Sequence, residues 1–227
     1  ISRDGYLKRV SLRSYQSSEG LTGIKEGDKL IGSLEADTVD TLLLFTSKGN
    51  YGYLPVYQIE EARWKDVGSH LNNVMRIDGD DKIINAILVK NFETCANVVT
   101  ISKLGMIKKT PINQWEVARN NKVFPAMKLK ANDELVKAFL AYENDDIVLV
   151  SKNGYTLRYS NEIIPATGSK SGGVIGIKLS KGDYLASGDS IDNSLNLLVL
   201  EASGQVKRIR NEDIQLTSRA VRGASIA

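Results

Sequence analysis

Paired basic side chains recur at a fixed distance after a glycine in this 227-residue chain. The first example is Gly5-Tyr6-Leu7-Lys8-Arg9, in which the pair begins three residues after the glycine. Later copies of the same phrase carry Lys108-Lys109, Arg158 and Lys207-Arg208. Lysine and arginine bind anionic groups, and a repeated structural unit would present them at equivalent places. The pattern therefore predicts a surface that binds an extended anion.

Two sets of cations form this predicted anion-binding band. The hairpin set lies at or beside the glycine and comprises Lys8, Arg9, Arg13, Lys103, Lys108, Lys109, Lys152, Arg158, Lys207, Arg208 and Arg210. The loop set lies in the segments that follow and comprises Arg63, Lys65, Arg119, Lys122, Lys170, Arg219 and Arg222. Simple solvation would explain any one hairpin, but recurrence favours a band. The second copy departs from the pattern, because Gly52 and Tyr53 occupy its two basic positions.

Residues suited to catalysis or metal binding do not form a set. His70 is the single histidine and Cys95 the single cysteine, and neither has a suitable partner nearby in the sequence. We expect His70 at the surface and Cys95 as a buried structural thiol. The segment around Gly172-Gly173 lacks the spacing of a phosphate-binding loop. We therefore expect no catalytic residue, metal or cofactor in this chain.

Composition is that of an ordinary globular protein, with 42% hydrophobic and 25% charged residues. The net charge of +3 is too small to indicate nucleic-acid binding by itself. A single cysteine suits a reducing compartment, and no apolar run approaches the roughly 20 residues of a membrane helix. Because the chain starts at Ile1 and stops within a repeat, we expect a fragment of a longer protein.

The elements that must position the cations recur with the glycines. The turn glycines are roughly 50 residues apart, which is typical of a propeller or another repeat array, and they are Gly5, Gly49, Gly105, Gly154 and Gly204. Apolar runs such as Leu42–Phe45 and Ile147–Val150 precede them and predict buried strands. The Asn153-Gly154 pair predicts a two-residue hairpin turn in which both residues have positive φ.

A second landmark with a similar period is an aspartate, found at Asp28, Asp81, Asp133 and Asp183. Each lies between two alternating segments, for example Ala126–Lys130 and Leu135–Leu140, so we expect it in the turn of a second hairpin. Two hairpins in each unit give four strands, the content of a propeller blade. The sequence predicts one all-β, propeller-like domain over 1–227, with a β-sandwich as the alternative. The expected units are 1–40, 41–93, 94–143, 144–192 and 193–227, the first and last incomplete.

The repeats resemble the C-terminal repeat of the GyrA/ParC family of type IIA DNA topoisomerases. The resemblance rests on the repeated glycine, apolar and basic phrase and on the stretches 63–70 and 172–177. It implies a β-pinwheel, a propeller in which neighbouring four-stranded blades exchange strands. Five blades are expected, with six blades and an open ring as alternatives. The family further implies that duplex DNA is bound and bent around the basic rim.

One departure from the family pattern favours its ParC branch, of the Gram-positive type. The GyrA branch carries a basic Gln-Arg-Arg-Gly-Gly-Lys-Gly box in the first blade, whereas Tyr15–Gly23 here lacks it. The resemblance then implies a non-catalytic module of the bacterial cytoplasm and nucleoid. It would work with the cleavage domains of its own polypeptide and with ParE, and ATP and Mg²⁺ would act elsewhere in the holoenzyme. A GyrA wrapping domain and a protein-interaction propeller remain the alternatives.

Overall fold

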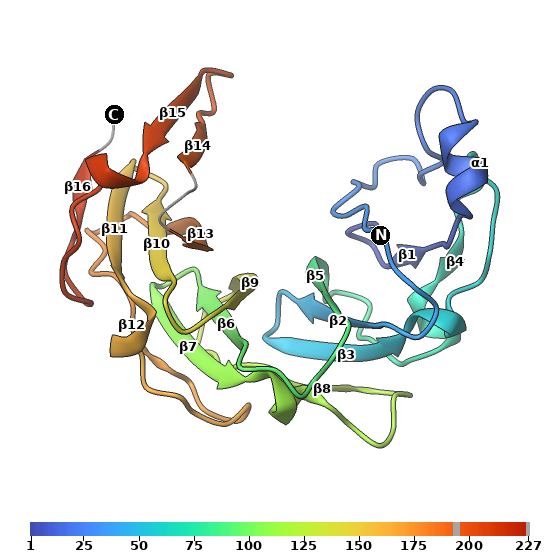
Figure 1. Cartoon of the computed structure of the whole chain (residues 1–227), viewed down its shortest axis with the longest axis horizontal. Coiled ribbons are helices and arrows are strands. Elements are labelled where there is room, and N and C mark those ends of the chain that lie inside the picture. Colours follow the sequence, from blue (N-terminus) through green and yellow to red (C-terminus); the bar gives the residue numbers. More distant parts are fainter. Residues whose placement is uncertain (193–195, 226–227) are drawn as a thin grey trace. The chain divides into compact units, whose positions relative to one another are not determined.

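The computed structural model describes residues 1–192 and 196–225, and its regular structure is almost entirely β (Figure 1). The described α-helix is α1 (Leu12–Gln16). Short 3₁₀ turns follow the hairpins, namely η1 (Val56–Gln58), η3 (Ile112–Trp115), η4 (Asn161–Ile163) and η5 (Asn211–Asp213), and η2 (Leu71–Asn73) follows the strand Ser69–His70. The all-β class predicted from the repeats is confirmed.

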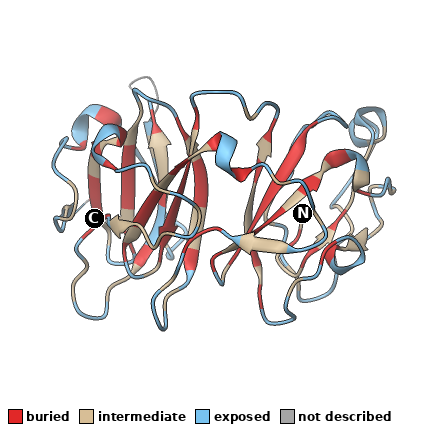
Figure 2. Ribbon diagram, turned by 90° about the horizontal axis from the view of Figure 1, so that it is seen from below, coloured by how far each residue is buried: buried red, intermediate tan, exposed pale blue. Residues whose placement is uncertain are grey.

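The chain folds into two compact units. Unit 1 comprises Ile1–Thr94 and Asn113–Ala126, and unit 2 comprises Cys95–Ile112 and Met127–Ala227. Each has its own apolar core, around Leu44 and Leu54 in unit 1 and around Ile101 and Leu149 in unit 2. Buried residues follow the strands, whereas the connecting loops are mostly exposed (Figure 2).

Unit 1 contains a four-stranded antiparallel sheet and a two-stranded one. The larger sheet has the order β5 (Ile83–Val89), β2 (Thr41–Thr46), β3 (Asn50–Pro55) and β8 (Val123–Pro125). The smaller pairs β1 (Tyr6–Leu7) with β4 (Ser69–His70). All six residues of β2 are buried, so both faces of this central strand are covered.

Unit 2 contains two four-stranded sheets and a separate hairpin. The first sheet has the order β12 (Val174–Ile175), β7 (Met106–Pro111), β6 (Asn97–Ser102) and β9 (Leu135–Ala141). The second has the order β13 (Leu185–Ile191), β10 (Asp146–Ser151), β11 (Tyr155–Ser160) and β16 (Ala224–Ser225). The hairpin joins β14 (Asn196–Leu200) to β15 (Val206–Arg210).

Neighbouring repeats exchange strands. In each four-stranded sheet, the outer strand of the hairpin pairs with a short strand from the following repeat, as in β3 with β8, β7 with β12 and β11 with β16 (Figure 1). The same kind of hydrogen bond lies at the end of the pairings of β1 with β4, β3 with β8 and β7 with β12, where a main-chain N–H donates to the carbonyl of the turn glycine. The donors are Leu71 to Gly5 at 2.8 Å, Ala126 to Gly49 at 2.8 Å and Gly176 to Gly105 at 2.7 Å. The strand exchange implied by the family resemblance is confirmed.

The hairpin turns differ from the predicted two-residue type. β10 ends at Ser151 and β11 begins at Tyr155, which leaves three residues in the loop. Gly154 has a φ of 78°, whereas Asn153 is not in the positive-φ region. Such three-residue loops combine a type I turn with a glycine in the left-handed conformation. The glycine prediction is therefore right, and the positive φ predicted for Asn153 is wrong.

The predicted second hairpin is also wrong. Ala126–Lys130 is not a strand, and the strands before and after Asp133 lie in different sheets, since β8 pairs with β3 and β9 with β6. The Asp133 carboxylate instead stabilises the turn of the hairpin of β6 and β7, where it accepts hydrogen bonds from the Leu104 N–H at 2.9 Å and the Ser102 hydroxyl at 2.7 Å. Equivalent bonds join Asp28 to Asp4 N–H, Asp81 to Lys48 N–H and Asp183 to Asn153 N–H. The repeated aspartate satisfies a turn amide that the ladder leaves unpaired.

Close main-chain approach is needed where the exchanged strand begins. Gly173 precedes β12 with a φ of 72°, and a Cβ added to it would lie 2.2 Å from the Ile107 carbonyl oxygen. Gly68 and Gly223 occupy the equivalent places before β4 and β16, also with positive φ. These glycines let the incoming strand reach the hairpin edge.

We predict that Gly173→Ala lowers the free energy of unfolding by about 2–4 kcal/mol, since left-handed strain and steric overlap add. Gly182→Ala is the matched control, because Gly182 has a φ of 81° but an added Cβ meets nothing within 4 Å. Its expected cost is only about 1–2 kcal/mol, from the backbone alone. Urea denaturation followed by circular dichroism measures both. Equal losses would contradict the close approach at Gly173.

Candidate nucleic-acid interface

The third residue after the turn glycine faces inward in the repeat of β6 and β7. Lys108 is fully buried, and its ammonium donates to the Thr110 hydroxyl at 2.9 Å and to the carbonyls of Gly168 at 3.3 Å and Ser169 at 3.4 Å. Burial lowers the pKa of Lys108 to about 8. An ammonium enclosed in this way cannot meet a phosphate, so the predicted placing of Lys108 on the DNA-binding rim is wrong.

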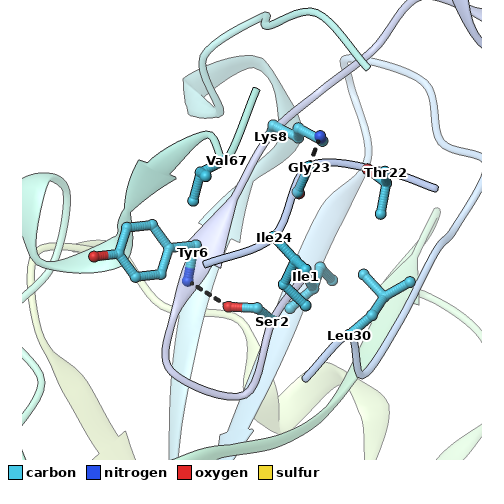
Figure 3. A pocket seen from close by; sticks show the side chains of 9 residues that line it. All are labelled: Ile1, Ser2, Tyr6, Lys8, Thr22, Gly23, Ile24, Leu30 and Val67. Carbon is cyan, nitrogen blue, oxygen red and sulfur yellow. Dashed lines mark hydrogen bonds between the residues drawn. The ribbon is translucent and has the colours of Figure 1, made fainter. Parts of the chain in front are cut away.

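Lys8 holds the equivalent loop in unit 1. Its ammonium donates to the carbonyl oxygens of Trp64 and Asp66. It also donates to the Gly23 carbonyl oxygen at 3.4 Å, as Figure 3 shows. The ammonium also lies 5.6 Å from the centre of the Trp64 ring. Burial lowers the pKa of Lys8, and the Asp66 carboxylate partly opposes that shift. The donors of Lys8 are thus directed at a neighbouring loop, which corrects its predicted role as a phosphate ligand.

The fourth residue after the glycine ties the hairpin to the next repeat. Lys109 donates to the Asn161 carbonyl at 2.7 Å, and Arg158 donates to the Asn211 carbonyl at 2.5 Å. Asn161 and Asn211 are the first residues of η4 and η5, so the two contacts are equivalent. Arg158 also binds the Asp146 carboxylate at 2.6 Å, and only 12% of its side chain is exposed. Lys109 and Arg158 therefore connect neighbouring repeats, and their predicted contact with DNA stays a prediction.

Several other cations of the hairpin set lie beside carboxylates. Lys103 is 3.1 Å from Glu134 and Lys207 is 3.2 Å from Glu201. Arg210 lies 2.8 Å from both Glu212 and Asp213, and Arg9 lies 3.9 Å from Glu61. The remaining members are exposed, namely Arg13, Lys152 and Arg208. Neutralised pairs contribute little attraction for a distant anion, so the hairpin set is weaker than predicted.

The loop set, by contrast, is largely exposed. In unit 1 it comprises Arg63, Lys65, Arg119 and Lys122, and in unit 2 it comprises Lys170 and Arg222 with the half-buried Arg219. Arg63 is 91% exposed although Asp66 lies 3.5 Å away. Each of these residues lies between a 3₁₀ turn and the exchanged strand that follows it. The loops therefore present most of the solvent-facing cations among the predicted residues.

The two arginines in the loop between η5 and β16 are held by contacts with an aromatic ring and a carbonyl group. The Arg222 guanidinium lies 4.1 Å from the centre of the Tyr155 ring and donates to the Tyr155 hydroxyl. Arg219 donates to the Ile175 carbonyl, which fixes it against the neighbouring strand. Stacking on an aromatic face holds a guanidinium in place without neutralising it.

Two exposed lysines beside these loops were not among the residues predicted from the sequence. The main-chain N–H of Lys128 donates to the Ser171 carbonyl at 3.0 Å, next to Lys170. The N–H of Lys178 donates to the Val221 carbonyl at 2.9 Å, next to Arg222. Each lies two residues after a residue whose N–H donates to the carbonyl of a turn glycine. Lys128 follows Ala126 in this way, and Lys178 follows Gly176. That shared offset is the signal that could have identified them.

The region that lacks the basic box packs against the first cationic loop. The Trp64 indole donates to the Gly20 carbonyl at 3.2 Å, and Tyr15 lies edge-on to the Trp64 ring at 5.3 Å. The Gly23 N–H donates to the Trp64 carbonyl at 3.0 Å. This segment supports the loop that presents Arg63 and Lys65.

The residues considered for catalysis have other roles. His70 is half-buried and not fully at the surface as predicted: its Nδ1 accepts the Asn72 N–H at 3.1 Å and its Nε2 lies 3.0 Å from the Asp4 carbonyl oxygen. Cys95 is exposed, so the predicted burial of its thiol is wrong. Within residues 1–192 and 196–225, no cluster of three or more His, Cys, Asp or Glu could hold a metal ion. In the same residues no helix has the length and apolarity needed to cross a membrane.

Comparison with known proteins places the chain in a family. The profile of the family described as DNA gyrase C-terminal domain, beta-propeller, matches residues 1–34, 40–90, 96–141, 145–192 and 202–227. The chain belongs to this family. The resemblance noted in the repeats is confirmed, and one matched segment corresponds to each expected unit.

Curated relatives are named as the A subunit of DNA topoisomerase 4. The protein from Bacillus subtilis is 37% identical over 224 residues, which are 98% of this chain and 28% of that protein. The protein from Staphylococcus aureus strain MRSA252 is 34% identical over 229 residues, with 100% and 28% coverage. The chain thus spans just over a quarter of the length of these relatives.

Solved structures of the family share the fold. A C-terminal domain of DNA topoisomerase IV matches with a TM-score of 0.86 and 37% identity, covering 100% of this chain and 71% of that one. The C-terminal domain of E. coli ParC matches with a TM-score of 0.77 and 17% identity, over 100% of this chain and 91% of that one. The second likeness shows the fold alone.

The lowered pKa of Lys108 predicts a pH-dependent stability. The unfolded chain keeps the Lys108 proton up to about pH 10.5 and the folded chain only up to about pH 8. Stability contributed by this group should therefore rise with pH between these values, by about 2–3 kcal/mol. Lys108→Leu should remove that rise.

The measurement is urea denaturation of both proteins from pH 7 to pH 10.5. Subtracting the two curves cancels groups that titrate alike in both proteins. A constant difference across this range would show that the folded chain keeps Lys108 protonated.

Proposed function

We propose that this chain binds duplex DNA without sequence preference and bends it, as a non-catalytic C-terminal domain of the A subunit of a type IIA topoisomerase. The observation that supports this most is the recurrence of exposed cations in equivalent loops. Lys65 and Lys170 occupy matching positions between a 3₁₀ turn and an exchanged strand, and Arg119 and Arg222 lie in the corresponding loops.

The exposed loop cations suit contacts with a phosphate backbone better than a base-reading role. Phosphate contacts release condensed counterions, which makes the affinity independent of sequence and steeply dependent on salt. Sequence-specific readout usually places a helix or a β-ribbon in the major groove, and α1 has only five residues. Bending a site of 20–30 bp costs about 1–6 kcal/mol, which many separate contacts can offset.

The wider setting follows from the relatives and is part of the same proposal. The domain would act with the cleavage domains of its own polypeptide and with a ParE partner, in the bacterial cytoplasm at the nucleoid. It would help to capture a DNA segment and to tune substrate preference in relaxation and decatenation. In this proposal ATP and Mg²⁺ are used by other parts of the holoenzyme. The missing basic box at Tyr15–Gly23 favours the topoisomerase IV setting over gyrase.

We predict that the logarithm of the binding constant for a 30-bp duplex falls linearly with the logarithm of the salt concentration, and that each loop cation contributes about 0.9 to the steepness of this slope. Lys65→Gln, Arg119→Gln and Lys170→Gln should each lower the slope by that amount. Fluorescence anisotropy over a salt series measures the slope. Energy transfer between dyes at the duplex ends reports bending.

Lys48→Gln is the matched control. Lys48 is also an exposed lysine, but its ammonium lies 2.5 Å from Asp80 and 3.8 Å from Asp78. Its replacement should leave the slope unchanged. Affinity that ignores salt, or equal effects of Lys48→Gln and the loop variants, would overturn the proposal and favour a protein-interaction propeller.

A further inference from the structure

We propose that Lys8 and Lys108 are positioning residues for DNA binding, each of which holds the loop that presents one exposed lysine. Lys108 would position Lys170, and Lys8 would position Lys65. This inference rests on the proposed function, because it assigns a role toward the same DNA-binding loops.

The hydrogen bonds of the two lysines converge on the residues next to the exposed cations. Lys108 donates to the carbonyls of Gly168 and Ser169, which immediately precede Lys170. Lys8 donates to the carbonyls of Trp64 and Asp66, the residues on either side of Lys65. Carbonyls turned inward fix the backbone from which the exposed side chain projects. Each inner ammonium therefore limits the positions that its outer lysine can occupy.

The second support comes from a repeat that lacks the inner lysine. Leu157 occupies the position of Lys108 in the following hairpin, three residues after its turn glycine, and is equally buried. Gly223 precedes the strand that covers it, as Gly173 does for Lys108. The fold therefore accepts a leucine at this position. Because a buried ammonium is costly to desolvate, packing alone would favour leucine, and the lysines indicate another requirement.

The loop beside Leu157 has its own means of ordering a cation. There Arg222 is held on the Tyr155 ring, at 4.1 Å from its centre. Lys170 and Lys65 have no equivalent aromatic support in the described residues, and their loops are held from beneath instead. Ordered cations lose less conformational entropy when they contact a phosphate.

The test is a double-mutant cycle on the full 227-residue chain, with the salt slope for a 30-bp duplex as the readout. In the parent chain, Lys170→Gln should lower the slope by about 0.9. In a Lys108→Leu background, Lys170→Gln should cause almost no further change, because Lys170 is already misplaced. Lys65→Gln should keep its full effect in the same background, since its own loop is intact.

The mirror cycle uses Lys8→Leu with Lys65→Gln and takes Lys170→Gln as its control. Amide hydrogen exchange of residues 168–171 provides a readout independent of DNA, and it should accelerate in Lys108→Leu. If Lys108→Leu fails to fold, Thr110→Val replaces it. That variant removes the hydroxyl that accepts from Lys108 and that donates to the Thr167 carbonyl at 2.7 Å.

The outcomes separate this inference from the proposed function. If the reductions in salt slope caused by the single substitutions add fully in both cycles, and the parent chain has a steep slope, the positioning role is overturned and DNA binding stands. Equal losses for Lys65→Gln and Lys170→Gln in every background would have the same meaning. A flat salt dependence in the parent chain would instead overturn the proposed function itself.

Discussion

The pairing of a hairpin with a short strand from the next repeat is the constraint on which the other features depend. The exchanged strand β8 has three residues, and β4, β12 and β16 have two each. Ladders of this length supply few hydrogen bonds, so side chains must hold the loops that lead into them. The inward lysines and the basic residues bound to 3₁₀ turns meet this need, while the repeated aspartates satisfy an amide in the turn of the hairpin itself. All of them form hydrogen bonds with main-chain groups that the short ladders leave unpaired, and they recur along the chain.

The exchange also explains why, from one repeat to the next, the residue in the hairpin and the residue opposite it in the exchanged strand change together. Lys8, Lys108 and Leu157 each lie against a positive-φ glycine at the start of the exchanged strand. In the second repeat the arrangement is reversed, because Gly52 is in the hairpin and Val123 begins the partner strand. The vacated space is used by Met75, whose sulfur would lie 2.4 Å from a Cβ on Gly52. Volume removed from one strand is thus filled from elsewhere in the same unit.

Much of the fold could be predicted because its signals are local. The turn glycines and the apolar runs before them identify each hairpin without knowledge of its partners. The role of Asp133 could not be read in this way, since its hydrogen bonds reach 29 and 31 residues back to Leu104 and Ser102. A polar residue near a turn suggests a turn of its own, and only the tertiary structure shows which amide it serves.

The cationic site was harder to predict, because strand alternation says which residues share a face but not whether that face is solvated. Lys108 and Lys109 point to opposite faces of β7, and the loop that leads into the exchanged strand β12 encloses the Lys108 ammonium. Net charge conceals the same distinction. Lys48, Lys103 and Arg210 lie beside carboxylates, whereas the stretch around Lys170, residues 163–182, contains no acidic residue. The field that a phosphate backbone would meet is therefore set by the loops, and the paired lysines of the hairpins determine how firmly those loops are held.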